Sequence, residues 1–203
     1  ENKLKSENVQ FNPISDIDLW NEISSSENNI FEGLSELFAT IINLIKANDY
    51  SFDFVYSLNN KSRLPINSHN MIVLKLLEPI FKDYCDELKI NNEIDFNDMI
   101  NIASKYISEE KFAHNYKYVI VDEYQDISKA RYNLLKKMRD KNFYKLFCVG
   151  DDWQSIYRFA GSDISFILDF DKYWGLSEKS KIETTYRFSP SLINISSQFI
   201  MKN

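Results

Sequence analysis

Residues 119–126 read Val-Ile-Val-Asp-Glu-Tyr-Gln-Asp (VIVDEYQD), an apolar run that ends in the adjacent acids Asp122 and Glu123. A short, continuous apolar run of this kind is typical of a strand that is buried on both faces of a parallel sheet. A second run, KLFCVGDD at residues 145–152, also ends in two acids. The segment between them, SKARYNLLKKMRDK at residues 128–141, has the apolar spacing of a helix. The order strand, helix, strand predicts an α/β fold with a parallel sheet.

The chain before this sheet is predicted to be helical. Apolar residues recur at helical spacing over residues 30–45, 68–88 and 94–107. Ser68 is a plausible N-cap of the second helix, and Pro79 within it should kink or split that helix. The turn-like segment at residues 57–70 should separate the first two helices. After the sheet, residues 181–187 (KIETTYR) predict a third extended segment, and Ser189-Pro190 predicts a helix start.

Composition and charge exclude several classes of protein. The chain has 203 residues with 44% hydrophobic and 15% aromatic content, which is enough for a sizeable core. A net charge of −6 without a basic tract argues against a self-sufficient nucleic-acid binder, although a local groove stays possible. Cys85 and Cys148 match no metal spacing and are expected to be core thiols in a reducing cytoplasm. No apolar run approaches the ~18 residues of a membrane span, so a cytoplasmic protein without a membrane partner is expected.

The four acids at the strand ends are candidates for metal chemistry. Ligands of open parallel sheets lie beyond the carboxyl ends of the strands, so these carboxylates should converge and need a cation to offset their repulsion. Mg²⁺ bound to a nucleotide meets this need, since it uses one or two carboxylates plus phosphates. Asp122 would hold the ion, and Glu123 would orient and deprotonate the attacking water. A solvated strand end is an equally good reading of this motif alone.

The loop after the second strand adds further candidates. Gln154 could contact the terminal phosphate of a nucleotide through its neutral amide. Tyr157, Arg158 and Phe159 could form a platform on which bases stack, or the aromatic rings could anchor the loop to the core. Arg187 could stabilise charge on the terminal phosphate, or form a surface salt bridge.

Three motifs resemble those of a known family. VIVDEYQD, VGDDWQSIYRFAGSD (residues 149–163) and IETTYRFSPSLINIS (residues 182–196) occur in order and resemble motifs II, III and IV of the UvrD/Rep-like superfamily 1 DNA helicases. IDFNDMI at residues 94–100 resembles the segment before motif II, and Trp153 is similar to the helicase IV branch. The resemblance implies part of a RecA-like P-loop NTPase that moves 3′ to 5′ along single-stranded DNA.

The resemblance also implies roles for residues of the nucleotide site. Asp122 corresponds to the magnesium-binding acid, and Glu123, beside the same metal, to the catalytic base. Gln125 and Asp126 complete the motif and connect the ATP site to neighbouring motifs. Gln154 corresponds to the glutamine at the γ-phosphate.

Further roles implied by the resemblance concern the base, the γ-phosphate and DNA. Tyr186 corresponds to the tyrosine that stacks on adenine, and Arg187 to the arginine at the γ-phosphate. Tyr157 corresponds to an aromatic residue near DNA, and Phe159 replaces a tryptophan that stacks on bases. Many members have arginine where this chain has Ala160. The coupling contact that this arginine makes in the family is therefore absent here, or Arg158 in the same DNA-binding loop makes it instead.

The phosphate-binding loop of the family is not present in this sequence. No G-x-x-x-x-G-K-[S/T] pattern occurs, and none of the four glycines precedes a lysine. The sequence is therefore interpreted as an internal fragment without the Walker A loop and motifs V–VI. Its expected divisions are a helical, 1B-like region at 1–110, a RecA-like portion at 111–185, and motif IV with the start of a second RecA-like domain at 186–203.

The fragment is expected to be inactive and monomeric. Its parent is expected to use ATP, Mg²⁺ and DNA that is single-stranded or has a 3′ tail. A stand-alone, non-catalytic nucleic-acid-binding or interaction module is the main alternative. A carboxylate-metal nuclease built on Asp122, Glu123 and Asp151 is a third reading.

Overall fold

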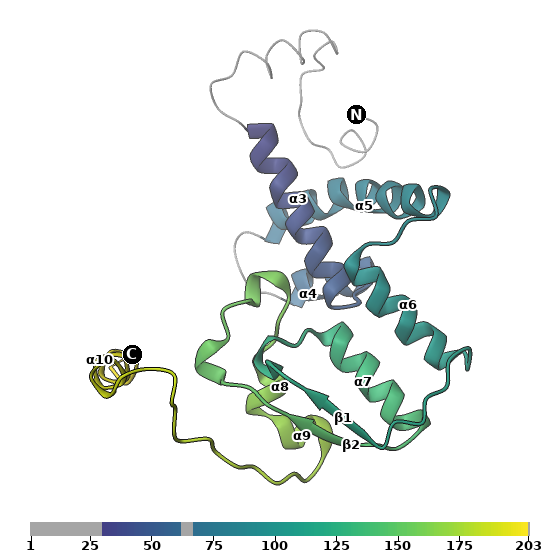
Figure 1. Ribbon diagram of the computed structural model, residues 1–203. Helices are drawn as coiled ribbons and strands as arrows, with labels where there is room; N and C mark the ends of the chain where they lie inside the picture. Colours follow the sequence, from purple (N-terminus) through teal and green to yellow (C-terminus); the bar gives the residue numbers. More distant parts are fainter. Residues whose placement is uncertain (1–29, 62–66, 203) are drawn as a thin grey trace. The chain divides into compact units, whose positions relative to one another are not determined.

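The computed structural model describes residues 30–61 and 67–202, and the chain divides between Leu168 and Asp169 into two compact units (Figure 1). The first unit holds the helical region and the sheet. The second holds the helices α9 (Phe170–Trp174) and α10 (Pro190–Ile200). No helix within the described ranges has both the length and the apolar character needed to cross a membrane.

Helices make up the N-terminal part of the first unit. They are α3 (Ile30–Ala47), α4 (Phe52–Lys61), α5 (Asn67–Ile90) and α6 (Phe96–Ser108). The helices predicted at residues 30–45, 68–88 and 94–107 are therefore confirmed, but α4 was not predicted.

The predicted turn at residues 57–70 was wrong at both ends, because α4 continues to Lys61 and α5 begins at Asn67. The Phe52 ring lies 5.2 Å from the Phe81 ring of α5, measured between centroids, and the Tyr56 hydroxyl donates to Glu78 Oε2 at 2.6 Å. Contacts with another helix, which local spacing does not reveal, therefore stabilise α4. Residues 62–66 of the predicted turn lie outside the described residues.

Helix α5 differs from its prediction at two positions. It begins at Asn67, so Ser68 lies within the helix and is not its N-cap. Pro79 lies inside one continuous helix and does not split it. Leu74 and Leu77 of α5 are buried at 8% and 0% exposure, and this packing offsets the loss of the proline hydrogen bond.

The sheet consists of two parallel strands joined by a helix. Strand β1 (Tyr118–Val121) pairs with β2 (Lys145–Cys148), with Val121 opposite Cys148. Helix α7 (Lys129–Lys141) connects them and begins after Ser128, whose hydroxyl accepts a hydrogen bond from the Arg131 amide at 3.4 Å. The predicted parallel strand–helix–strand unit is confirmed. The described residues contain this unit and not a complete RecA-like sheet.

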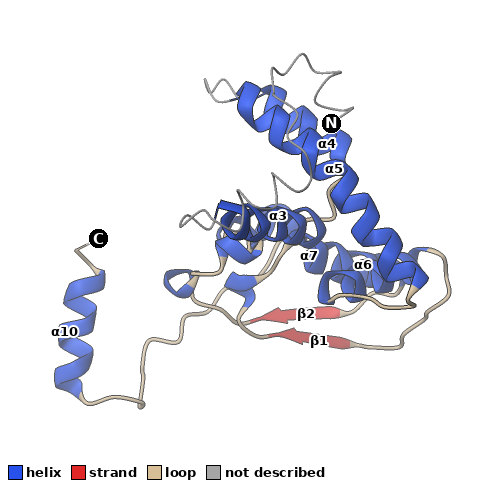
Figure 2. Ribbon diagram, turned by 90° about the horizontal axis from the view of Figure 1, so that it is seen from above, coloured by secondary structure: helices blue, strands red, loops and turns tan. Residues whose placement is uncertain are grey.

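The prediction that the strands are buried on both faces is wrong. Exposed and partly buried residues alternate along both strands, as in a sheet that is covered on one side. Figures 1 and 2 show α7 beside the strand pair, and in Figure 2 it lies to one side of it. The other face carries Tyr118, Ile120 and Phe147, which are 68%, 72% and 61% exposed. An apolar run thus predicted the strands correctly, but their burial depends on what covers each face.

The second unit confirms the predicted start of a helix. Helix α10 starts at Pro190 directly after Ser189, as the Ser-Pro pair predicts. Residues 181–187 form no strand. An extended segment becomes a strand only by hydrogen bonding to a neighbour, and the described part of this unit contains no strand with which it could pair.

Candidate functional site

A strained turn follows strand β1 and carries the two adjacent acids. Glu123 has φ 50° and ψ 43°, in the left-handed region that non-glycine residues rarely adopt. Asp122 Oδ1 accepts a hydrogen bond from the Glu123 amide at 2.9 Å, and the short helix η1 (Tyr124–Asp126) follows. Both acids are exposed. Strain of this kind is concentrated at functional sites, where surrounding contacts hold it in place.

The side chain of Gln125 joins the ends of the two strands. It is 1% exposed. Its Nε2 donates to Glu123 Oε2 at 2.8 Å, and its Oε1 accepts from the Asp151 amide after β2 at 3.0 Å. The same residue's carbonyl oxygen accepts from the Ser155 hydroxyl at 3.3 Å. One buried amide therefore fixes the Glu123 carboxylate relative to the loop that follows β2.

Gly150 makes this close approach possible. A Cβ atom at position 150 would lie 2.6 Å from Gln125 Oε1 and 3.1 Å from the Gln125 backbone nitrogen. The Tyr124 amide also donates to the Val149 carbonyl at 2.8 Å, so the η1 turn is hydrogen-bonded directly to the end of β2. Any side chain at position 150 would therefore displace the Gln125 amide that accepts from Asp151.

Gln154 lies on η2 (Asp152–Gln154), and Asp151 orients its side chain. Asp151 Oδ2 accepts from Gln154 Nε2 at 2.8 Å, while Asp151 Oδ1 accepts from the Trp153 amide at 3.1 Å. Asp151 therefore acts as the cap of η2, a role that the sequence analysis missed. An aspartate directly before a short helix is a recognised capping signal and could have revealed it.

A cavity of about 380 Å³ opens beside the acids. Its lining comes from the end of β1, from η1 and from α7: Val121, Asp122, Glu123, Asp126, Ile127, Arg131, Leu134 and Leu135. Asp126 Oδ1 is buried and has no hydrogen-bond partner among the described residues. Arg131, which the sequence analysis did not single out, is the basic side chain in this lining.

The strand-end carboxylates fit Mg²⁺ only if other groups complete its coordination. Strands β1 and β2 are adjacent, as predicted, but the described residues contain no group of three or more acidic, His or Cys side chains that could hold one metal ion. The four acids therefore follow neighbouring strand ends, as expected, but no three of them form a group within the described residues that could bind one cation. Asp122 and Glu123 remain, and Mg²⁺ is commonly held by one or two carboxylates with phosphate oxygens and water.

Tyr157, Arg158 and Phe159 lie together on an exposed loop around η3 (Arg158–Ala160). The two aromatic rings have centroids 6.0 Å apart and planes at 43°. They are 48% and 70% exposed, so neither ring anchors the loop by burial. The arrangement leaves two aromatic faces and one guanidinium available to a ligand.

Tyr186 and Arg187 belong to the second unit. Tyr186 is 94% exposed, and the Arg187 amide is hydrogen-bonded to Thr185 Oγ1 at 3.4 Å. The arrangement of the two units relative to each other is not determined. The structure therefore places Asp122, Gln154 and the side chains that connect them in the first unit. The roles of Tyr186 and Arg187 stay predictions.

These features define a parallel α/β protein with an acidic site where its strands end. More particularly, residues 7–174 match the family described as the UvrD/REP helicase N-terminal domain. The chain belongs to this family, and the resemblance to UvrD-like superfamily 1 helicases is confirmed.

Individual relatives are helicases that are much longer than this chain. It is 38% identical over 131 residues to DNA helicase IV of Escherichia coli K12, covering 64% of this chain and 19% of the relative. It is 32% identical over 134 residues to the ATP-dependent DNA helicase PcrA of Bacillus subtilis, covering 64% and 18%. PcrA of Staphylococcus epidermidis is 30% identical over 157 residues, covering 73% and 21%. The chain thus spans about a fifth of the length of these relatives.

Proposed function

We propose that this chain supplies part of the ATPase site and of the DNA-contacting surface of an ATP-dependent DNA helicase or translocase. The proposal is supported by membership of the UvrD/REP family and by relatives named DNA helicase IV and ATP-dependent DNA helicase PcrA. The Gln125 bridge is the observation that carries it. This one side chain connects the Glu123 turn with the loop that bears Gln154 and, a few residues later, Tyr157 to Phe159.

In the proposed reaction the side chains at the strand ends divide the work. Asp122 would hold Mg²⁺ bound to ATP, and Glu123 would accept the proton of the attacking water. Gln125 keeps the Glu123 carboxylate in position through its 2.8 Å hydrogen bond. Gln154 contacts the γ-phosphate and can change its contacts when that phosphate leaves. Because the same loop carries the aromatic side chains, hydrolysis can alter the grip on single-stranded DNA and so drive movement. The 3′-to-5′ direction of that movement is what the resemblance to the family implies.

Removal of the base tests this function. In a full-length helicase containing this sequence, Glu123→Gln should lower DNA-stimulated ATP hydrolysis by about a hundredfold or more, because a neutral amide cannot accept the proton. ATP binding, measured with a fluorescent analogue, should persist. Asp152→Asn is the matched control, since it neutralises an exposed strand-end acid with no proposed role and should leave turnover unchanged.

Two results would contradict the proposal. Retained turnover in the Glu123→Gln helicase would remove Glu123 from the role of base. Robust ATP turnover by the purified 203-residue chain would show that the site does not need a G-x-x-x-x-G-K-[S/T] loop. We expect no turnover from that chain, because the backbone donors of such a loop normally hold the phosphates.

A further inference from the structure

The C-terminal turn of α3, residues 44–48, lies in the interior of the first unit. Ile45, Lys46 and Ala47 are 4%, 5% and 4% exposed. A lysine is rarely buried to this degree unless its charge is paired. We call residues 44–48 the α3 end. Its two sides contact different parts of the unit.

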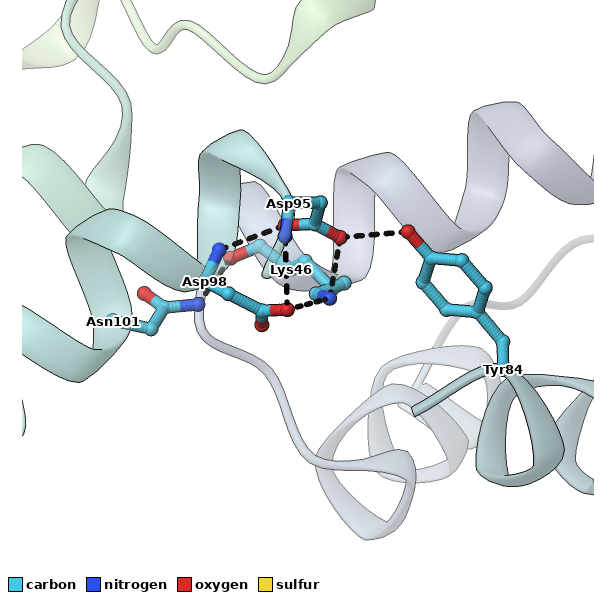
Figure 3. Close-up of polar contacts among 5 residues, drawn as sticks. All are labelled: Lys46, Tyr84, Asp95, Asp98 and Asn101. Atoms are coloured by element: carbon cyan, nitrogen blue, oxygen red, sulfur yellow. Dashed lines mark hydrogen bonds and ion pairs between the residues drawn. The ribbon is translucent and has the colours of Figure 1, made fainter. Parts of the chain in front are cut away.

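On one side, partly buried ion pairs hold the α3 end to α6 (Figure 3). Lys46 Nζ lies 2.5 Å from Asp95 Oδ2 and 2.8 Å from Asp98 Oδ2. These carboxylates also form the capping box of α6, and the Tyr84 hydroxyl of α5 donates to Asp95 Oδ2 at 2.9 Å. Asn101 Nδ2 donates to the Lys46 carbonyl at 2.9 Å, which satisfies one of the carbonyls left free at a helix end. The α3 end is therefore fixed to the start of α6 by charge and hydrogen bonds.

On the other side, the α3 end contacts the loop of Tyr157, Arg158 and Phe159. Gly161 ends η3 with φ +95°. A Cβ atom at position 161 would lie 2.8 Å from the Ala47 Cβ, with Asn48 Nδ2 and Leu44 Cδ2 at 3.7 and 3.9 Å. The loop backbone thus rests directly on the methyl group of Ala47, with no room for a side chain between them.

The same loop is also fixed at its far end. The Asp163 amide donates to the Ile127 carbonyl at 3.1 Å, and Ser128 and Ser162 form an antiparallel bridge. The loop backbone therefore lies between the α3 end and the segment that follows η1. Since the side chains of the loop are exposed, contacts of its backbone must define its position.

We propose that the α3 end is a positioning element for the loop of Tyr157, Arg158 and Phe159, and that the ion pairs of Lys46 hold this element in place. The backbone part of the inference stands on these contacts alone. Its consequence, that the α3 end sets how the aromatic side chains meet single-stranded DNA, rests on the proposed function.

Hydrogen exchange of backbone amides in the 203-residue chain tests the contact. In Gly161→Ala the amides of residues 160–162 should exchange about tenfold faster, because the new methyl group must displace the loop from Ala47. Gly175→Ala is the matched control. Gly175 also has a positive φ, +87°, with ψ −172°, a region that alanine tolerates even less than that of Gly161. A Cβ there has nothing within 4 Å, so the control introduces backbone strain without the contact. The control should leave the exchange of residues 160–162 unchanged.

A second substitution separates the contact from backbone strain at position 161. Ala47→Gly combined with Gly161→Ala removes the methyl group that the new Cβ would meet, and it should return the exchange rates of residues 160–162 most of the way to those of the parent chain. Equal exchange of this loop in the Gly161→Ala and Gly175→Ala chains would overturn the inference. So would a double variant that exchanges as fast as Gly161→Ala.

The ion pairs are tested in the same way. Lys46→Met should speed exchange both at the start of α6 and in residues 160–162. Lys89→Met removes an exposed pair with Asp86 and should affect neither. Faster exchange at α6 without any change in the loop would overturn the role of Lys46. If Lys46→Met does not fold, Asp98→Asn, which weakens one pair and keeps the other, serves in its place.

Binding of a fluorescent oligothymidylate distinguishes this inference from the proposed function. If the chain binds the oligonucleotide, Gly161→Ala should weaken binding several-fold and the double variant should restore it. If no variant binds while the exchange rates change as expected, the positioning role stands and the DNA-binding assignment of this chain fails. Unchanged affinity in a Gly161→Ala chain whose loop exchanges faster would overturn the link to DNA.

Discussion

Gln125 makes hydrogen bonds to both strand ends from a side chain that is almost fully buried. Gln125→Ala should lower the free energy of unfolding by about 1–3 kcal/mol, because it removes two hydrogen bonds of a buried side chain and leaves a cavity in its place. Urea denaturation of the 203-residue chain measures this loss. Gln154→Ala removes an exposed amide and should change the stability by less than about 0.5 kcal/mol. Equal losses in the two variants would show that the Gln125 bridge does not stabilise the unit.

Site residues differed in how far the sequence revealed them. The positions of Asp122 and Glu123 at a strand end followed from the apolar run, and the structure places them there. The left-handed conformation of Glu123 and the capping role of Asp151 were not predicted. Both depend on how the ends of β1 and β2 approach each other across Gln125 and Gly150. Local spacing carries no information about such an approach.

At the scale of elements, the start of α6 shows how a cap and a buried charge combine. Burial alone would raise the pKa of Asp95, but hydrogen bonds from Lys46, the Asp98 amide and Tyr84 lower it overall. Burial likewise opposes the charge of Lys46, but its hydrogen bonds with Asp95 and Asp98 raise the pKa of this amine above its usual value. The stabilisation from Asp95 is therefore present above the unfolded pKa of about 3.9 and is lost as the pH falls through the lower folded value.

Asp95→Asn tests this dependence. Asparagine still caps a helix, so the change removes mainly the charge. Between pH 6 and pH 3 the parent chain should lose more unfolding free energy than the Asp95→Asn chain, as measured by urea denaturation across this range. Ser128→Ala, at the cap of α7, should lower stability by about 1 kcal/mol without altering the pH dependence. Parallel pH profiles for the parent and Asp95→Asn would contradict the lowered pKa of Asp95.

Elements were predictable where their pattern was local. Amphipathic spacing revealed α3 and α6, and Ser-Pro revealed the start of α10. Helix α4 was missed because its aromatic contacts with α5 stabilise it. Residues 181–187 form no strand, since the described part of their unit contains no strand with which they could pair. For α4 the deciding contacts come from another part of the chain, which local spacing does not reveal.

At the scale of the whole first unit, one face of the sheet is apolar and exposed. Tyr118, Ile120 and Phe147 form this face. Replacing Ile120 and Phe147 together by threonine should change the unfolding free energy by less than about 1 kcal/mol, because both side chains are exposed and threonine suits a strand. The solubility limit of the chain should rise, since the apolar patch becomes smaller. Urea denaturation and the concentration at which the protein precipitates measure these effects.

Leu146 supplies the comparison for this double variant. Leu146 lies on the same strand as Phe147, but on the partly buried face of the sheet. Leu146→Thr should destabilise the unit by roughly 1–3 kcal/mol, because it removes packed apolar atoms and buries a hydroxyl. A larger loss from the Ile120/Phe147 variant than from Leu146→Thr would show that the exposed face contributes to the stability of the unit.

The Gln125 bridge has a consequence for the order in which the chain folds. The Asp151–Gln125 hydrogen bond joins residues 26 apart in sequence, and the Lys46–Asp95 contact joins residues 49 apart. Contacts this distant form only after the intervening chain has closed into a loop, at an entropic cost that local helices do not bear. We therefore expect the helices to form before the strained Glu123 turn. A nascent or partly refolded chain would then have most of its secondary structure while its acidic site is still unformed.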